Sequence, residues 1–122
     1  MTAIVGWLFE VSIKQGQLEN LKALIREMAE RVEATEPDTL TYEWSISEDG
    51  STGHVQERYV SSEAALAHLA SFNEIFADRL MSMADPERMT IYGSPSAALK
   101  DEVSGINPTY MNPVGGFVRG SG

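Results

Sequence analysis

Apolar and polar residues alternate along two stretches of the chain. Residues 3–13 place an apolar side chain at every second position, which predicts a half-buried strand: Val5, Trp7, Phe9, Val11 and Ile13. Residues 39–47 alternate more strictly, with Leu40, Tyr42, Trp44 and Ile46 on one side, and predict another strand. A polar turn with two glycines follows at residues 48–53, so the next stretch, 54–60, is expected to return as its hairpin partner.

Two other stretches have helical spacing. Apolar residues recur every three or four positions over residues 17–34, which predicts an amphipathic helix that ends before Pro37. Ser61 and Ser62 are good cap residues for a second helix. The pair Ser71 and Glu74 resembles a capping box, so the sequence predicts a new helix starting at Ser71. Residues 84–86 should end that helix, and residues 88–92 are expected to form a fourth strand.

The predicted order is therefore β-α-β-β-α-β. This is the α+β, ferredoxin-like order, in which a four-stranded antiparallel sheet carries its helices on one face. Residues 1–92 form this domain, and residues 93–122 are a C-terminal extension expected to pack on it. The extension is expected to hold a short helix capped by Ser94, and then an edge strand or packed tail over 110–118; residues 119–122 are expected to be disordered. The second sheet face is either polar in a monomer or covered by a two-fold partner.

Composition narrows the classes of function. The 122 residues suffice for one domain, and 43% of them are hydrophobic. The net charge of −9 argues against nucleic acid and anionic membranes as partners. The absence of cysteine excludes disulfides and thiolate metal sites, and two histidines are too few for a multi-histidine metal site within one chain. We expect a cytoplasmic protein that is purified without metal or haem.

The candidate chemistry lies in two histidines, one carboxylate and a set of aromatic residues. His68 is either a general base near neutral pH or a structural helix histidine. His54 opens a strand and is either a ligand contact or an exposed histidine. Glu57 lies between Val55 and Tyr59 on one strand face and needs a partner, either a histidine in a proton relay or an arginine such as Arg88. The aromatic residues are either core or the wall of an apolar cavity: Trp7, Tyr42, Trp44, Tyr59, Phe72 and Phe76.

Three stretches carry a family resemblance: 14–17 (KQGQ), 36–43 (EPDTLTYE) and 57–68 (ERYVSSEAALAH). Together they resemble the antibiotic-biosynthesis-monooxygenase superfamily of small dimeric α+β barrels, over residues 3–92. The resemblance implies a homodimer, and it matches His68 to a helix histidine of that family. The family often has a second histidine shortly after this helix position, whereas here Ser71 is followed by Phe72 and Asn73.

The resemblance implies a cofactor-independent monooxygenase that acts on a small aromatic, quinol-like or anthrone-like substrate. In that case His68 is the expected proton acceptor with Glu57 and Tyr59 beside it, and the expected substrate contacts are Trp7, Tyr42, Trp44, His54, Phe72 and Phe76. A non-catalytic small-molecule binding domain on the same scaffold is the alternative, and an isomerase or lyase is a third reading. A closed aromatic cavity that contains His68 or His54 would favour an enzyme.

Overall fold

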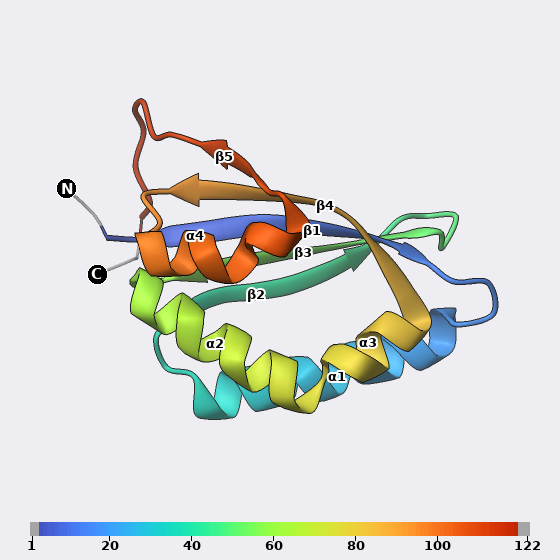
Figure 1. The fold of residues 1–122 in the computed structure, drawn as a ribbon. Helices are drawn as coiled ribbons and strands as arrows, with labels where there is room; N and C mark the ends of the chain where they lie inside the picture. The colour runs from blue at the N-terminus through green and yellow to red at the C-terminus, as the bar shows by residue number, and fades with distance from the viewer. Residues whose placement is uncertain (1–2, 120–122) are drawn as a thin grey trace.

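A five-stranded sheet with helices on one face forms the body of the protein (Figure 1). The computed structural model describes residues 3–119, so the last three residues of the expected disordered end lie outside the described part. The strands are β1 (Val5–Ile13), β2 (Thr39–Ile46), β3 (Thr52–Tyr59), β4 (Ala84–Gly93) and β5 (Thr109–Met111). The helices are α1 (Leu18–Thr35), α2 (Ser62–Ile75), α3 (Ala77–Met83), α4 (Ala97–Val103) and the 3-10 turn η1 (Ser104–Ile106).

The sheet has the order β2-β3-β1-β4-β5, with the apolar strand β1 at its centre. Strand β1 pairs antiparallel with β3 and with β4, and β2 pairs antiparallel with β3. This confirms the ferredoxin-like α+β fold predicted from the sequence. The prediction of four strands is wrong in one respect, because the short strand β5 from the C-terminal extension adds a fifth strand, parallel to β4.

Strand alternation assigns the inner and outer faces of the sheet. On β3, Val55, Glu57 and Tyr59 are buried toward the helices, whereas Gln56 and Arg58 are exposed on the other face. The apolar core consists of two clusters. One contains Trp7, Tyr59, Met89 and the α4 residues Leu99 and Val103, and the other joins α1 to α3. Phe9 packs against both clusters, so the two halves of the core meet at the middle of β1.

The helical boundaries differ from the predicted ones at two points. Helix α2 continues through Ser71 and ends at Ile75. Helix α3 begins after Phe76, so Ser71 does not cap a new helix. The α4 helix is capped by Ser96, whose side chain accepts a hydrogen bond from the Leu99 N–H, and not by Ser94. Within residues 3–119, no helix is long and apolar enough to cross a membrane.

Gly93 closes strand β4 where the C-terminal extension begins. Its φ is +99°, and a Cβ atom built there would lie 2.5 Å from the carbonyl oxygen of Ile4, the residue just before β1. We predict that Gly93→Ala lowers the free energy of unfolding by about 1–3 kcal/mol or more, because it adds backbone strain and a backbone clash.

Gly105→Ala is the matched control, since a Cβ atom at Gly105 would meet nothing within 4 Å. Chemical denaturation should find Gly105→Ala close to the wild type. Equal stabilities of the two variants would contradict the assigned role of Gly93.

Candidate functional site

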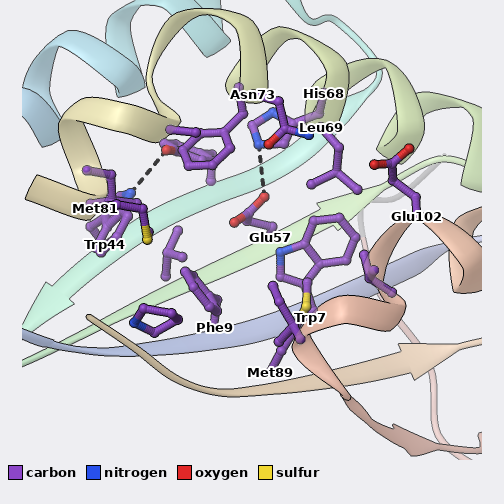
Figure 2. Close-up of a pocket in the computed structure, with 18 residues that line it drawn as sticks. Trp7, Phe9, Trp44, Glu57, His68, Leu69, Asn73, Met81, Met89 and Glu102 are labelled. Carbon is purple, nitrogen blue, oxygen red and sulfur yellow. Dashed lines mark hydrogen bonds and ion pairs between the residues drawn. The ribbon is translucent and has the colours of Figure 1, made fainter. Parts of the chain in front are cut away.

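A cavity of about 290 Å³ lies between the inner face of the sheet and helices α2 to α4. Its walls come from both core clusters, with Trp7 and Met89 from one and Leu80 from the other. Figure 2 shows these side chains around an open space, with Trp7, Phe9 and Trp44 below and the α2 residues His68, Leu69 and Asn73 above. The volume is near the lower end of the range for sites that bind small organic molecules.

Helix α2 carries His68 over this cavity. The Ser61 side chain caps the helix by accepting from the Ala64 N–H, and this fixes its first turn directly after β3. His68 follows just under two turns later, is only 5% exposed and lines the cavity. Its Nδ1 lies 2.8 Å from Glu36 Oε1. Its Nε2 lies 3.1 Å from Glu57 Oε1, and Figure 2 marks this contact with a dashed line. The imidazole therefore bridges two carboxylates.

Glu57 is brought to the cavity by the alternation of β3. The Glu57 side chain is 8% exposed and lines the cavity. Its carboxylate contacts His68 and also accepts a hydrogen bond from the Tyr59 hydroxyl. The partner of this carboxylate is thus the histidine and not an arginine. The other partner considered from the sequence, Arg88, lies 3.9 Å from Glu10 instead.

These contacts set the protonation of the site. Burial by itself lowers the pKa of His68, but the hydrogen bond and charge of Glu57, together with the charge of Glu36, outweigh it, so the pKa of His68 is raised. Burial, followed by the charge of Glu57, raises the pKa of both Tyr42 and Tyr59. Both tyrosines are therefore neutral hydroxyls at physiological pH.

Four of the aromatic residues expected at a ligand site do line the cavity: Trp7, Tyr42, Trp44 and Phe72. Trp44 Nε1 donates to the Tyr42 hydroxyl over 3.1 Å, and this fixes the two rings relative to each other. The structure does not bring the other two expected contacts to the cavity. Phe76 is buried in the α1–α3 cluster, where the helical break places it. His54 points to the opposite face of the sheet, where its Nε2 lies 3.4 Å from Glu10, because it lies three positions before Glu57 on a strand whose successive side chains alternate between faces.

Two parts of the site were not found by sequence reasoning. Glu36 is one of them, and its signal was a carboxylate at the end of a helix, directly before Pro37. The second is a wall from the C-terminal extension, formed by Glu102, Val103 and Ile106. Val103 is the one of these three with a sequence signal, since it shares an apolar face of a short capped helix with Leu99. Within residues 3–119, no group of three or more His, Cys, Asp or Glu side chains could hold a metal ion.

Solved structures with the same fold cover most or all of the chain. MupZ from Pseudomonas fluorescens has a TM-score of 0.85 at 23% identity over 98% of both chains, so the likeness includes the C-terminal extension. A mutant of SnoaB, a cofactor-independent oxygenase from Streptomyces nogalater, has a TM-score of 0.64 at 13% identity, over 79% of this chain and 97% of the other. A conserved protein from Methanosarcina mazei Go1 has a TM-score of 0.65 at 18% identity, over 75% and 92% of the two chains. At these identities, the likeness establishes the fold and not the reaction.

The sequence itself matches a family model. No curated protein matches this sequence significantly. The model described as antibiotic biosynthesis monooxygenase matches residues 4–75, which include β1, the Glu36 turn, Glu57 and His68. Since this match spans more than half of the 122 residues and the fold agrees with it, the chain belongs to the antibiotic biosynthesis monooxygenase family.

Proposed function

We propose that the protein is a cofactor-independent monooxygenase that binds a small aromatic hydroxyl compound, of the quinol or anthrone type, in the cavity beside Glu57 and His68. The observation that carries this proposal is the carboxylate–imidazole pair in the wall of an otherwise aromatic and aliphatic cavity. Flat aromatic ligands pack well against such walls, and the pair is the group that can take up a proton from them.

The pair holds one titrating proton. Nδ1–H of His68 donates to Glu36 whether the imidazole is neutral or protonated. The proton that His68 gains and loses therefore lies on Nε2, facing Glu57 Oε1. When that proton is absent, the pair accepts one from the substrate hydroxyl or from an activated carbon. Proton uptake removes negative charge from the cavity wall as the substrate becomes an anion, which avoids two neighbouring anions in an apolar site.

The substrate anion then supplies the electrons. Electrons of the anion pass to dioxygen as a carbon–oxygen bond forms, and the peroxide anion takes the proton held by the Glu57–His68 pair, which gives a hydroperoxide of the substrate. The pair then removes the remaining proton from the same carbon as the C=O bond forms and the oxygen–oxygen bond breaks, and that proton goes to the leaving hydroxide, which departs as water. For an anthrone-type carbon, CH2 and O2 become C=O and H2O, so one oxygen atom enters the substrate and the other leaves as water.

The charge of the cavity selects the substrate class. Glu57 and Glu102 are the carboxylates among the lining residues, and His68 is the one side chain there that can become cationic. A ligand with its own carboxylate or phosphate would therefore be repelled, whereas an uncharged aromatic hydroxyl compound would not. The volume of about 290 Å³ fits a compound of a few fused rings at most.

We predict that anthrone and hydroquinone probes are oxidised with the uptake of oxygen faster than their spontaneous rate. His68→Gln and Glu57→Gln should each lower turnover by about 10²–10⁴-fold, the usual effect of removing a general base. An oxygen electrode measures the rate, and mass spectrometry with ¹⁸O₂ should find one labelled atom in the product.

His54→Gln is the matched control, because it makes the same substitution on the opposite face of the sheet. It should keep most of the activity, and circular dichroism should show all three variants folded. Wild-type rates equal to the spontaneous rate for probes that bind in the cavity would contradict the oxygenase proposal and favour the binding-domain alternative.

We also propose that the protein is a homodimer whose subunits stack their open sheet faces. Helices cover the other face only (Figure 1). The open face carries the half-buried Leu8 and the exposed Tyr92. A hollow of about 850 Å³ lies between this face and residues after β5 that include Pro113 and Phe117. Val114, Phe117 and Val118 in the tail are also exposed, and such grouped apolar side chains are typical of an interaction surface.

Sedimentation equilibrium at tens of micromolar should give twice the chain mass of 13.4 kDa. Leu8→Glu should shift the equilibrium toward the monomer, because it places a charge in the centre of the stacked faces. A monomer mass for the wild-type protein at that concentration would rule out this dimer.

A further inference from the structure

We propose that Glu36 is a positioning residue for the reaction: it fixes the tautomer of His68 and supplies the charge that makes this imidazole a strong base. This inference rests on the proposed oxygenase function, because it assigns the third member of the same proton-accepting site. Glu36 lies outside the cavity lining and contacts the histidine from behind, so its role is exerted through His68.

The carboxylate of Glu36 is held in place from several sides. Its residue is the C-cap of α1, where its backbone N–H donates to the Val32 carbonyl over 2.9 Å. The Thr39 N–H donates to the Glu36 carbonyl over 3.1 Å, and the Thr39 hydroxyl donates to Glu36 Oε1 over 2.9 Å. The same loop is tied to the end of β3, since the Val60 N–H donates to the Asp38 carbonyl. Glu36 Oε1 is thus fixed relative to the strand that carries Glu57.

Such a fixed acceptor decides which nitrogen of His68 titrates. A carboxylate can only accept, and one faces each nitrogen, but Nδ1 lies closer to Glu36 (2.8 Å) than Nε2 does to Glu57 (3.1 Å), so a neutral His68 keeps its proton on Nδ1. Nε2 is then the nitrogen that gains and loses a proton, and it is the one that faces Glu57. Without Glu36, a neutral His68 can carry its proton on Nε2, and that nitrogen then cannot accept a proton from the substrate.

Glu36 also adds negative charge without occupying the cavity. The titratable groups that face His68 are Glu36 from the end of α1, Glu57 and Tyr59 from β3, and Tyr42 from β2. Both tyrosines are neutral, so the two carboxylates alone oppose the cost of burying an imidazolium. The Glu36 side chain is 16% exposed, so it reaches His68 from the edge of the core and not from within the cavity.

The test is a pH titration of the two histidines by NMR in the wild type, in Glu36→Gln and in Glu33→Gln. Glutamine keeps a carbonyl acceptor of the same length but removes the charge. Glu33 is an exposed carboxylate near the same end of α1, so Glu33→Gln controls for the loss of one negative charge. We expect the pKa of His68 to fall by about one unit or more in Glu36→Gln alone, while the pKa of His54 stays unchanged in both variants.

The pH dependence of turnover provides a second test. The base form of His68 exists above its pKa, so turnover of the anthrone probe should rise with pH through that value. In Glu36→Gln the midpoint of this rise should move to lower pH together with the NMR pKa, and the plateau rate should fall by up to about tenfold for each unit by which the pKa falls, because the base is weaker.

A His68 pKa that is equal in the wild type and in Glu36→Gln would overturn the inference, whether or not the protein consumes oxygen. A plateau rate that falls in Glu36→Gln with no movement of the pH midpoint would also overturn it, since that would indicate a structural role only. An NMR shift in a protein that oxidises no probe would instead overturn the proposed reaction and leave the coupling between Glu36 and His68 established.

Discussion

A buried carboxylate in the inner face of the sheet is the constraint around which this structure is organised. Glu57 takes a core position on β3, between Val55 and Tyr59, where an unpaired charge would cost several kcal/mol. Its compensation comes from His68 above it and Tyr59 beside it. The core divides into two clusters, and the cavity lined by Glu57 and His68 takes its walls from both of them.

The pairing depends on the positions of three segments. Ser61 starts α2 within two residues of Tyr59, and this places His68 back over the strand it has just left. The end of α1 carries Glu36 to the same point from the other side, and Thr39 holds it there. The C-terminal extension then completes the cavity wall with Glu102, Val103 and Ile106. The family match ends at residue 75, so this wall is formed by a part of the chain outside the matched region.

Local patterns predicted much of this arrangement. Alternation predicted the strands and most of their inward positions, including the neighbouring positions of Glu57 and Tyr59, and the serine cap located the start of α2. Leu40 is the exception, because the irregular pairing between Thr39 and Thr41 leaves its side chain 38% exposed. The partnership of Glu36 with His68 joins residues 32 positions apart and follows from the packing of α1, which no local pattern encodes. The sequence predicted a break in the helix at Ser71, whereas the structure has it at Phe76. Phe76 is buried in the α1–α3 cluster, so tertiary packing outweighed the capping signal at Ser71. The sequence predicted an edge strand or packed tail over 110–118, and β5 at the edge of the sheet covers only Thr109–Met111. Its parallel pairing with β4 could not be predicted, because three residues are too few for a periodic signal.

We propose that the Glu57–His68 pair receives the hydroxyl of an uncharged aromatic ligand, and two matched ligands can show whether it does. 1-Naphthol and 1-methoxynaphthalene share their ring system and differ in the hydroxyl proton. NMR titration at a pH where His68 is neutral should find 1-naphthol binding at least about tenfold more tightly, the difference expected from one hydrogen bond to a charged group. It should also find the ring signals of His68 moving while those of His54 stay in place. Equal affinities for the two compounds, with His68 undisturbed by either, would contradict the account.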